Sequence, residues 1–267
     1  MLKFLYQTSL GRILLKPLVH PAVSRLAGRF CDSKFSNAMI PYFIRKNGID
    51  MEEYAETDYE SFNQFFCRKI KAECRPVDSA EDALVAPCDG LLSIYPIEKG
   101  MVIPVKQSRF GIADLLKDER LAGKYNGGTC LVFRLCVNHY HRYMYPDNGS
   151  KSENIFIPGV LHTVRPIALR GVPVFVENSR EYTILHTKNF GDIVQMEVGA
   201  MLVGRIKNHH GKSQIKKGQE KGYFEYGGST IILLIKQGIT EFPNFYYQLT
   251  NRGEEFPVKQ GERLNER

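Results

Sequence analysis

The sequence contains no apolar run that approaches the ~18 residues of a membrane-spanning helix, which excludes an integral helical membrane protein. It has no Gly-rich phosphate loop and no H-E-x-x-H zinc motif. The six cysteines include no C-x-x-C pair, so we expect reduced, buried thiols rather than a disulfide framework or a zinc site. The N-terminus lacks the small-residue cleavage site of a signal peptide, and we expect none.

What is present is an ordinary globular composition. The chain has 267 residues, of which 43% are hydrophobic and 24% are charged. These values exclude a disordered or fibrous chain. The length suits one large domain, or a compact core with a smaller appendage.

The positive charge is concentrated at the start of the chain. Of the formal net charge of +7, six units come from the first 50 residues, where eight basic residues face only Asp32 and Asp50. Apolar residues in the same segment recur at helical spacing, for example Leu10, Ile13 and Leu14. Pro17 and Pro21 are expected to break the segment into short helices.

A basic, amphipathic, helical segment suits an anionic membrane surface, which attracts each basic residue by about 1 kcal/mol. The alternative is a helical cap whose apolar side packs on the protein and whose charges are solvated. Nucleic acid is the least favoured partner, because the sequence has no RNA-binding or helix-turn-helix motif. The sequence alone leaves the first two alternatives open.

The texture of the chain changes from helical to β-rich at about Pro76. Residues 1–70 are predicted to be helical, including a helix over Tyr54–Phe66. Short β-branched segments punctuated by Gly, Pro and Asn then predict strands at Leu91–Ile97, Thr129–Val137, Asn154–Ile157, Val172–Phe175, Tyr182–His186, Ile193–Val198, Met201–Ile206 and Thr230–Ile235. Ile112–Leu116 is predicted to be a helical insertion. The polar stretch after Asn244 gives no prediction.

These elements predict an α+β fold, with a mainly antiparallel β sandwich or open barrel as its body and a helical N-terminal arm. We place the boundary between a membrane-associating helical region, 1–75, and a β-rich catalytic body, 76–267.

Candidate catalytic residues stand at the ends of predicted strands. The sequence Gly227-Gly228-Ser229-Thr230 opens a very apolar strand, which is an unusual place for a hydroxyl. Taken alone it is also compatible with a simple tight turn. Asp89 lies in a turn between apolar segments, His141 follows one strand and His162 follows another. Together they form an acid, two bases and a nucleophile.

The sequence as a whole resembles the phosphatidylserine decarboxylase family. The resemblance rests on an ordered set of motifs that runs from about residue 55 to residue 243: FNQFFCRK at 62–69, the Asp89-Gly90 turn, YHR at 140–142, EVGA at 197–200, KGQEKGYF at 217–224 and GGST at 227–230. None of these motifs is specific by itself, but the ordered set is.

The resemblance implies a self-processing enzyme. Ser229 would attack the carbonyl of Gly228 and cut the chain into a β chain, 1–228, and an α chain, 229–267, whose first residue becomes a pyruvoyl group. This covalent cofactor would form a Schiff base with phosphatidylserine of the bilayer and release CO2 to give phosphatidylethanolamine. No metal and no nucleic acid are implied. We expect a peripheral protein at the cytoplasmic face of an anionic membrane, with a homodimer left open.

The sequence departs from the family pattern at one position. Many members read Tyr-His-Arg-x-His, and the second histidine is the base for self-cleavage, but this chain has Met144 there. His162 stands where many members have an aromatic residue. We therefore predict the triad Asp89–His162–Ser229 for self-cleavage and a role for His141 at the substrate.

Other histidines and other functions rank lower. His139 is a weaker alternative to His141, since alternation along a strand points both to one face. His186, His209 and His210 are expected to be surface or structural residues. A non-catalytic lipid-binding β-sandwich module is the second functional hypothesis, and Met144 favours it. A serine hydrolase ranks third, because the chain has no Gly-x-Ser-x-Gly elbow.

Overall fold

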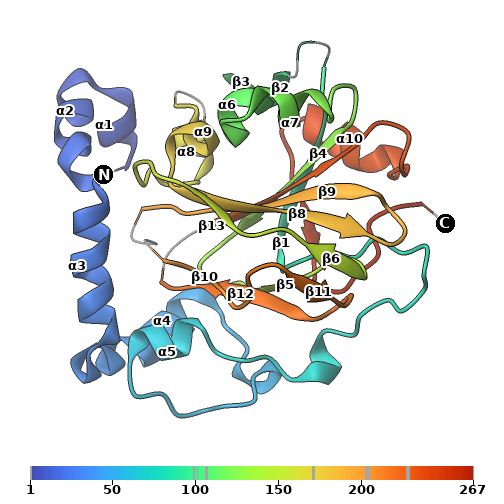
Figure 1. The fold of residues 1–267 in the computed structure, drawn as a ribbon. Helices are drawn as coiled ribbons and strands as arrows, with labels where there is room; N and C mark the ends of the chain where they lie inside the picture. The colour runs from blue at the N-terminus through green and yellow to red at the C-terminus, as the bar shows by residue number, and fades with distance from the viewer. Residues whose placement is uncertain are drawn as a thin grey trace.

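The computed structural model describes residues 2–98, 100, 102–105, 108–169, 172–201, 205–226 and 229–266. Figure 1 shows a helical arm standing beside a β-rich body. The body has mainly antiparallel strands, so the predicted α+β class with an antiparallel body and an N-terminal helical arm is confirmed.

The arm consists of short helices that begin and end at local sequence signals. Its elements are α1 (Leu2–Gln7), α2 (Ser9–Leu18), α3 (Pro21–Asp32), the 3-10 helix η1 (Lys34–Met39) and α4 (Ile40–Asn47). Thr8 caps α2 through its side chain, which accepts from the Gly11 amide. Pro21 begins α3, as predicted, whereas Pro17 is tolerated in the last turn of α2. Gly48, at φ +60°, ends α4 in the left-handed region.

The predicted helix over Tyr54–Phe66 is wrong for most of its length. Only α5 (Phe62–Phe66) is helical, flanked by the 3-10 helices η2 (Met51–Glu53) and η3 (Ala72–Cys74). The side chain of Ser61 accepts from the Gln64 amide and starts α5 there. Tyr54 lies in an isolated bridge with Ile70 instead. The spaced aromatic residues do share one buried cluster, but only those of α5 reach it from a helix. Tyr54 and Tyr59 reach it from non-helical backbone.

The main sheet of the body is antiparallel, and its strand order is β11-β6-β8-β9-β13-β4-β1-β14, with β7 paired to β8 off this path. Its strands are β1 (Gly90–Pro96), β4 (Thr129–Leu135), β6 (Gly149–Lys151), β7 (Ile155–Ile157), β8 (Arg180–Thr187), β9 (Asp192–Val198), β11 (Ser213–Ile215), β13 (Ser229–Ile235) and β14 (Phe256–Val258). The strand that begins at Ser229 thus lies in the interior of the sheet, between β9 and β4.

Two smaller sheets and several helices cover the main sheet. The short sheet has the order β10-β12-β5 and the hairpin pairs β2 with β3. The remaining elements are β2 (Val102–Val105), β3 (Ser108–Gly111), β5 (Arg142–Met144), β10 (Ile206–Asn208), β12 (Glu220–Phe224), α6 (Ile112–Leu116), α7 (Glu119–Gly123), α8 (Pro166–Leu169), α9 (Val174–Glu177) and α10 (Asn244–Asn251). The predicted helical insertion coincides with α6.

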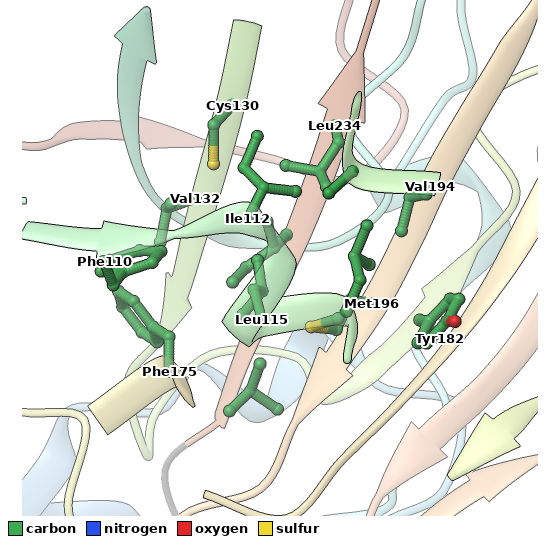
Figure 2. Packing of buried hydrophobic residues seen from close by; sticks show 14 of the residues in the cluster. Phe110, Ile112, Leu115, Cys130, Val132, Phe175, Tyr182, Val194, Met196 and Leu234 are labelled. Atoms are coloured by element: carbon green, nitrogen blue, oxygen red, sulfur yellow. The ribbon is translucent and has the colours of Figure 1, made fainter. Parts of the chain in front are cut away.

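The main sheet is buried on both faces, which explains why β13 is apolar at nearly every position. On one face, Ile232 and Leu234 pack with side chains of α6 and α9, such as Leu115 and Phe175, in the cluster drawn in Figure 2. On the other face, Ile231 packs in a second cluster with residues of the short sheet, including Tyr143 and Phe224. Alternate residues of β13 therefore face different layers.

The structure differs from the sequence prediction in two segments and adds elements in a third. Val172–Phe175 is not a strand, because Pro173 precedes the short helix α9 and Val174 packs into the helix-covered core. Residues 202–204 of the strand predicted over Met201–Ile206 lie outside the described residues, and β10 begins at Ile206. The polar stretch after Asn244 contains α10 and β14.

A candidate active site at the start of strand β13

Ser229 is fully buried at the first position of β13, opposite Leu135 of β4. Its Oγ has no hydrogen-bond partner among the described residues, and Gly227 and Gly228 lie outside them. Because Ser229 is two residues before Ile231, its side chain faces the short sheet. A buried hydroxyl without a hydrogen bond lowers the stability of the fold, and such groups are found where they have a functional role. This position is therefore a candidate reactive group.

His141 precedes β5 and is held to the short sheet by its carbonyl, which accepts from the Phe224 amide at 3.0 Å. Its Nδ1 lies 2.9 Å from the carbonyl oxygen of His139. A carbonyl only accepts, so Nδ1 carries the proton and Nε2 carries a lone pair. That Nε2 is buried and has no partner in the described chain. Burial, followed by the charge of Arg68, lowers the pKa of His141 well below its usual value. His141 is therefore a neutral imidazole with a free basic nitrogen.

Ser229 and His141 belong to the same layer of the protein. Ser229 faces the short sheet from the main sheet, and His141 directly precedes β5 and is bonded through its carbonyl to β12 of the short sheet. Tyr143, two residues after His141, packs in one cluster with Ile231, two residues after Ser229. The structure thus places an unpartnered hydroxyl and an unpartnered imidazole nitrogen between the same two sheets, although the two atoms form no hydrogen bond with each other. Activation of a serine nucleophile requires a base within hydrogen-bond reach, and His141 is a candidate for that base.

Asp89 is buried but its carboxylate is directed to an arginine. Its two oxygens accept from Nε and Nη2 of Arg75 at 2.7 and 2.6 Å, and Oδ1 also accepts from the Gln260 amide at 2.9 Å. Glu53 pairs with the same guanidinium at 3.1 Å. Asp89 has no hydrogen bond to His162, which is the contact that the sequence-based triad requires. In this structure Asp89 joins the C-terminal segment to the body.

His162 is occupied at both ring nitrogens. Nδ1 lies 3.2 Å from the hydroxyl of Tyr6, and Nε2 lies 3.2 Å from a carboxylate oxygen of Glu177 in α9. Burial lowers the pKa of His162, and the charge of Glu177 acts in the opposite direction. Val164, two residues later, packs in the helix-covered cluster rather than beside the short sheet. The structure therefore does not bring His162 into hydrogen-bond contact with Ser229.

Met144 faces away from the layer that contains Ser229. It packs with Ala83 and Val85, while Tyr143 and Tyr145 on either side of it belong to the cluster between the sheets. A histidine at this position of the present backbone would accordingly point away from Ser229. The absence of a histidine here removes no neighbour of the candidate nucleophile.

Four other histidines are engaged in local contacts. Nδ1 of His139 accepts from the Cys136 amide at 3.1 Å. His186 and His209 pair with Asp192 and Glu220 at 2.7 and 2.6 Å, and Nδ1 of His210 lies 3.3 Å from the hydroxyl of Tyr145.

A buried ion pair near the site was missed by sequence reasoning. Glu197 of β9 and Lys221 of β12 are fully buried and lie 2.6 Å apart, joining the main sheet to the short sheet. Glu197 is opposite Ile231, so it lies on the same face of the sheet as Ser229. Burial raises the pKa of Glu197 and lowers that of Lys221. A glutamate close to the end of a mostly apolar strand is the signal that indicates such a pair.

We predict that Lys221→Met destabilises the fold by about 3–5 kcal/mol, because it leaves the Glu197 carboxylate buried without a counter-charge. The double variant Glu197→Leu/Lys221→Met is expected to recover most of this loss, since apolar replacement of a whole buried pair is often neutral. Denaturant unfolding measures both. A double variant no more stable than Lys221→Met would show that the pair is needed for more than charge balance.

Comparison with known proteins gives the family. The family model described as phosphatidylserine decarboxylase matches residues 62–265. The chain is 44% identical to "phosphatidylserine decarboxylase proenzyme 2" of Clostridium acetobutylicum over 266 residues, which cover 99% of this chain and 91% of the relative. The chain belongs to the phosphatidylserine decarboxylase family. Similar relatives of this family include the proenzymes of Ruminiclostridium cellulolyticum, at 40% identity over 99% of this chain and 90% of the relative, and Clostridium botulinum strain 657, at 39% over 100% and 92%.

Membership of the phosphatidylserine decarboxylase family confirms the resemblance and the predicted class of enzyme, a decarboxylase. It favours this function over both alternatives, the lipid-binding module and the serine hydrolase. The word proenzyme in the names of the relatives agrees with the predicted processing of the chain. The matched region contains Asp89, His141, His162 and Ser229.

Proposed function

We propose that this chain is a phosphatidylserine decarboxylase that cuts itself between Gly228 and Ser229 and converts Ser229 into a pyruvoyl group. The observation that carries the proposal is the fully buried Ser229 hydroxyl, which has no hydrogen-bond partner in the described chain and directly follows two glycines. A glycine before the nucleophile lacks a Cβ, so its carbonyl is easily exposed to a neighbouring hydroxyl.

The cut requires the proton of Ser229 to leave. Oγ attacks the carbonyl carbon of Gly228, the bond to the nitrogen of residue 229 breaks, and an ester replaces the peptide. Loss of the α-proton of residue 229 then expels the Gly228 carboxylate and leaves a dehydroalanine. Water replaces its nitrogen as ammonia, which gives the new N-terminus. Each step before the last needs a group that accepts a proton within the buried layer.

The contacts favour His141 as that group. Its Nε2 is buried, unprotonated and without a partner, and it lies in the layer that Ser229 faces. Both ring nitrogens of His162 are already in contact with other side chains. The assignment of the base to His162, oriented by Asp89, stays a prediction. The second role of His141, holding a proton at the reacting carbon of the substrate, uses the same free nitrogen.

The pyruvoyl group, once formed, supplies an electron sink for the electron pair left when CO2 departs from the serine head group. The protein's own contribution is to bury the reacting position and to keep a neutral imidazole in the same layer. The proposed substrate is phosphatidylserine and the product phosphatidylethanolamine. Intact mass spectrometry tests the proposal: fragments 1–228 and 229–267, the smaller blocked at its N-terminus, are expected, together with CO2 release from phosphatidylserine vesicles. An uncut chain that still releases CO2 would refute it.

The two chains are expected to stay together after the cut. The α chain contributes β13, which pairs with β9 and β4 of the β chain along most of its length. Gln260 of the α chain also donates to Asp89, to Pro87 and to the carbonyl of Arg142. These contacts join the α chain to the β chain, and none of them depends on the peptide bond that is cut.

We also propose that the helical arm places the enzyme on an anionic membrane, at its cytoplasmic face. No helix in the described residues is long and apolar enough to cross a bilayer. The arm nevertheless exposes large apolar side chains, among them Ile13 (63%), Leu26 (69%) and Phe35 (86%). Exposed apolar side chains on helices that also carry basic residues suit helices lying in the membrane interface.

The arm also packs on the body, as the second alternative from the sequence expects, and the membrane surface is the proposal for its exposed side. Leu5, Leu15 and Val19 are buried in a cluster with Val160 and Met201 of the body. Cys31 and Ile40 are buried with the aromatic residues of α5. Deleting the arm would therefore remove core contacts, and point substitutions on its exposed side are the cleaner test.

We expect Arg12→Gln/Lys16→Gln to weaken binding to anionic vesicles by about 2 kcal/mol, roughly 30-fold, at low salt. Ile13→Gln/Leu26→Gln should weaken it at every salt concentration, because apolar contact is not screened. Vesicle sedimentation from low to physiological salt measures both.

The matched control is Lys212→Gln/Lys216→Gln, which removes two exposed charges beside β11, on the side of the body away from the arm. It should bind like the parent protein. Equal losses in the control and in the arm variant would show that net charge alone, and no surface of the arm, governs attraction to the membrane.

A further inference from the structure

We propose that Asn63 and Asp32 are positioning residues for self-cleavage, which hold the segment just before the cut against the helical arm and beside His141. This inference rests on the proposed cleavage between Gly228 and Ser229. It concerns two polar residues, Asn63 in α5 and Asp32 at the end of α3.

Asn63 connects the arm to Tyr226, three residues before Ser229. Its Oδ1 accepts from the Tyr226 amide at 3.0 Å, and its Nδ2 donates to Oδ1 of Asp32 at 2.7 Å. Asn63 is only 7% exposed. The carboxylate of Asp32 accepts only, which fixes the orientation of the Asn63 amide and turns its oxygen toward Tyr226.

Asp32 reaches the same segment by a second route. Its other oxygen, Oδ2, pairs with Arg205 at 2.6 Å, and Nε of Arg205 lies 2.8 Å from a carboxylate oxygen of Glu225. Two chains of contacts, through Asn63 and through Arg205, therefore lead from one carboxylate of α3 to two consecutive residues of the segment. Burial raises the pKa of Glu225, and the charge of Arg205 opposes the rise.

Aromatic contacts place the held segment beside His141. The ring of Tyr226 meets the rings of Phe62 and Phe66 edge-on, with centroids 4.9 and 5.3 Å apart. Phe66 also packs on the imidazole of His141, with centroids 4.1 Å apart. One phenylalanine of α5 therefore contacts both the residue before the two glycines and the proposed base.

These contacts fix Tyr226 and Ser229, the two described residues that flank the two glycines at the proposed cut. Tyr226 is held through its amide and its ring, and Ser229 is held by pairing with Leu135. Reactions of this kind depend on the placement of the reacting atoms, and a shift of about 1 Å costs roughly 10²-fold in rate. Asn63 and Asp32 act through Tyr226, so their loss should slow the cut and leave its chemistry unchanged.

The test follows the cut over time during cell-free synthesis of the full chain. Asn63→Leu, which removes both hydrogen bonds, should slow it ~10–100-fold. Asn63→Asp should also slow it, because it places two carboxylates side by side. The swap Asp32→Asn/Asn63→Asp restores a donor at 32 and an acceptor at 63, and should return the rate to within about threefold of the parent protein.

The control is Asp50→Asn, a carboxylate that caps η2 and has no contact to the segment. It should cut at the parent rate. Asn63→Asp cutting at the parent rate, or a swap as slow as Asn63→Asp, would overturn the proposal. A defect that disappears at lower temperature, where a destabilised fold recovers, would show a merely structural role and overturn it equally. A parent chain that is not cut would refute the proposed function itself. A parent chain that is cut, with Asn63 variants that cut equally fast, would refute only the role of Asn63 and Asp32.

Discussion

Ser229→Ala is expected to remain a single chain of 267 residues with no release of CO2 from phosphatidylserine. The reason is chemical, because without Oγ no ester forms at Gly228 and no pyruvoyl group arises. The substitution removes one buried oxygen that has no hydrogen-bond partner in the described chain, so the fold should be as stable as before or more stable. A denaturing gel, intact mass and a CO2 assay measure the three quantities.

The neighbouring hydroxyl provides the matched control. Thr230 is also fully buried, and its Oγ1 also lacks a partner in the described chain. It points to the other face of β13, because successive residues of a strand alternate. Thr230→Val should therefore still be cut. An active, uncut Ser229→Ala protein would end the pyruvoyl proposal. An uncut Thr230→Val protein would show that the cut depends on the other face of β13, the one that Thr230 occupies.

The second large effect is expected at His141. His141→Ala should slow the cut ~10²–10⁴-fold, the usual contribution of a general base, so that mostly uncut chain remains after hours. His162→Ala should cut at close to the parent rate, because that imidazole contacts Tyr6 and Glu177 instead of Ser229. The reverse pattern, a blocked His162→Ala and a His141→Ala that cuts but decarboxylates poorly, would support the triad predicted from the sequence.

The pH dependence of the cut gives an independent measurement. Burial holds the pKa of His141 well below the ordinary histidine value of 6.5, so the free base persists on both sides of that pH. The rate should therefore not fall as the pH drops through 6.5. The unfolded chain binds a proton there and the folded chain does not, so the stability of uncut Ser229→Ala should decline below pH 6.5. A cleavage rate that halves at pH 6.5 would point to an exposed histidine.

Much of the fold was predictable from local pattern. The strands β1, β4, β9 and β13 follow apolar runs bounded by glycine or polar turns, and α6 follows its predicted bounds. The short helix α9 was not, because three apolar residues after a proline suit a strand equally well. The elements after Asn244 were missed because their stabilising contacts are with distant strands, as in the pairing of β14 with β1.

The candidate residues could be chosen from the sequence, but their grouping could not. Ser229 and both histidines could be recognised from hydroxyl and imidazole groups at the ends of apolar strands. Which histidine shares a layer with Ser229 depends on contacts between remote segments, such as that of Tyr6 with His162, 156 residues later. Similarly, burial of Asp89 indicates that its carboxylate has a partner, but the local sequence does not show whether that partner is His162 or Arg75.

The interior position of β13 has a consequence for the mature protein. The fragment that begins at residue 229 is a small part of the chain, yet it provides the strand between β9 and β4, in which every residue is buried. Amides in the centre of such a strand exchange with solvent only when the whole domain opens. In the processed enzyme, the slowest hydrogen exchange should therefore lie in the smaller subunit, at Ile231–Leu234, and the two subunits should dissociate only upon global unfolding.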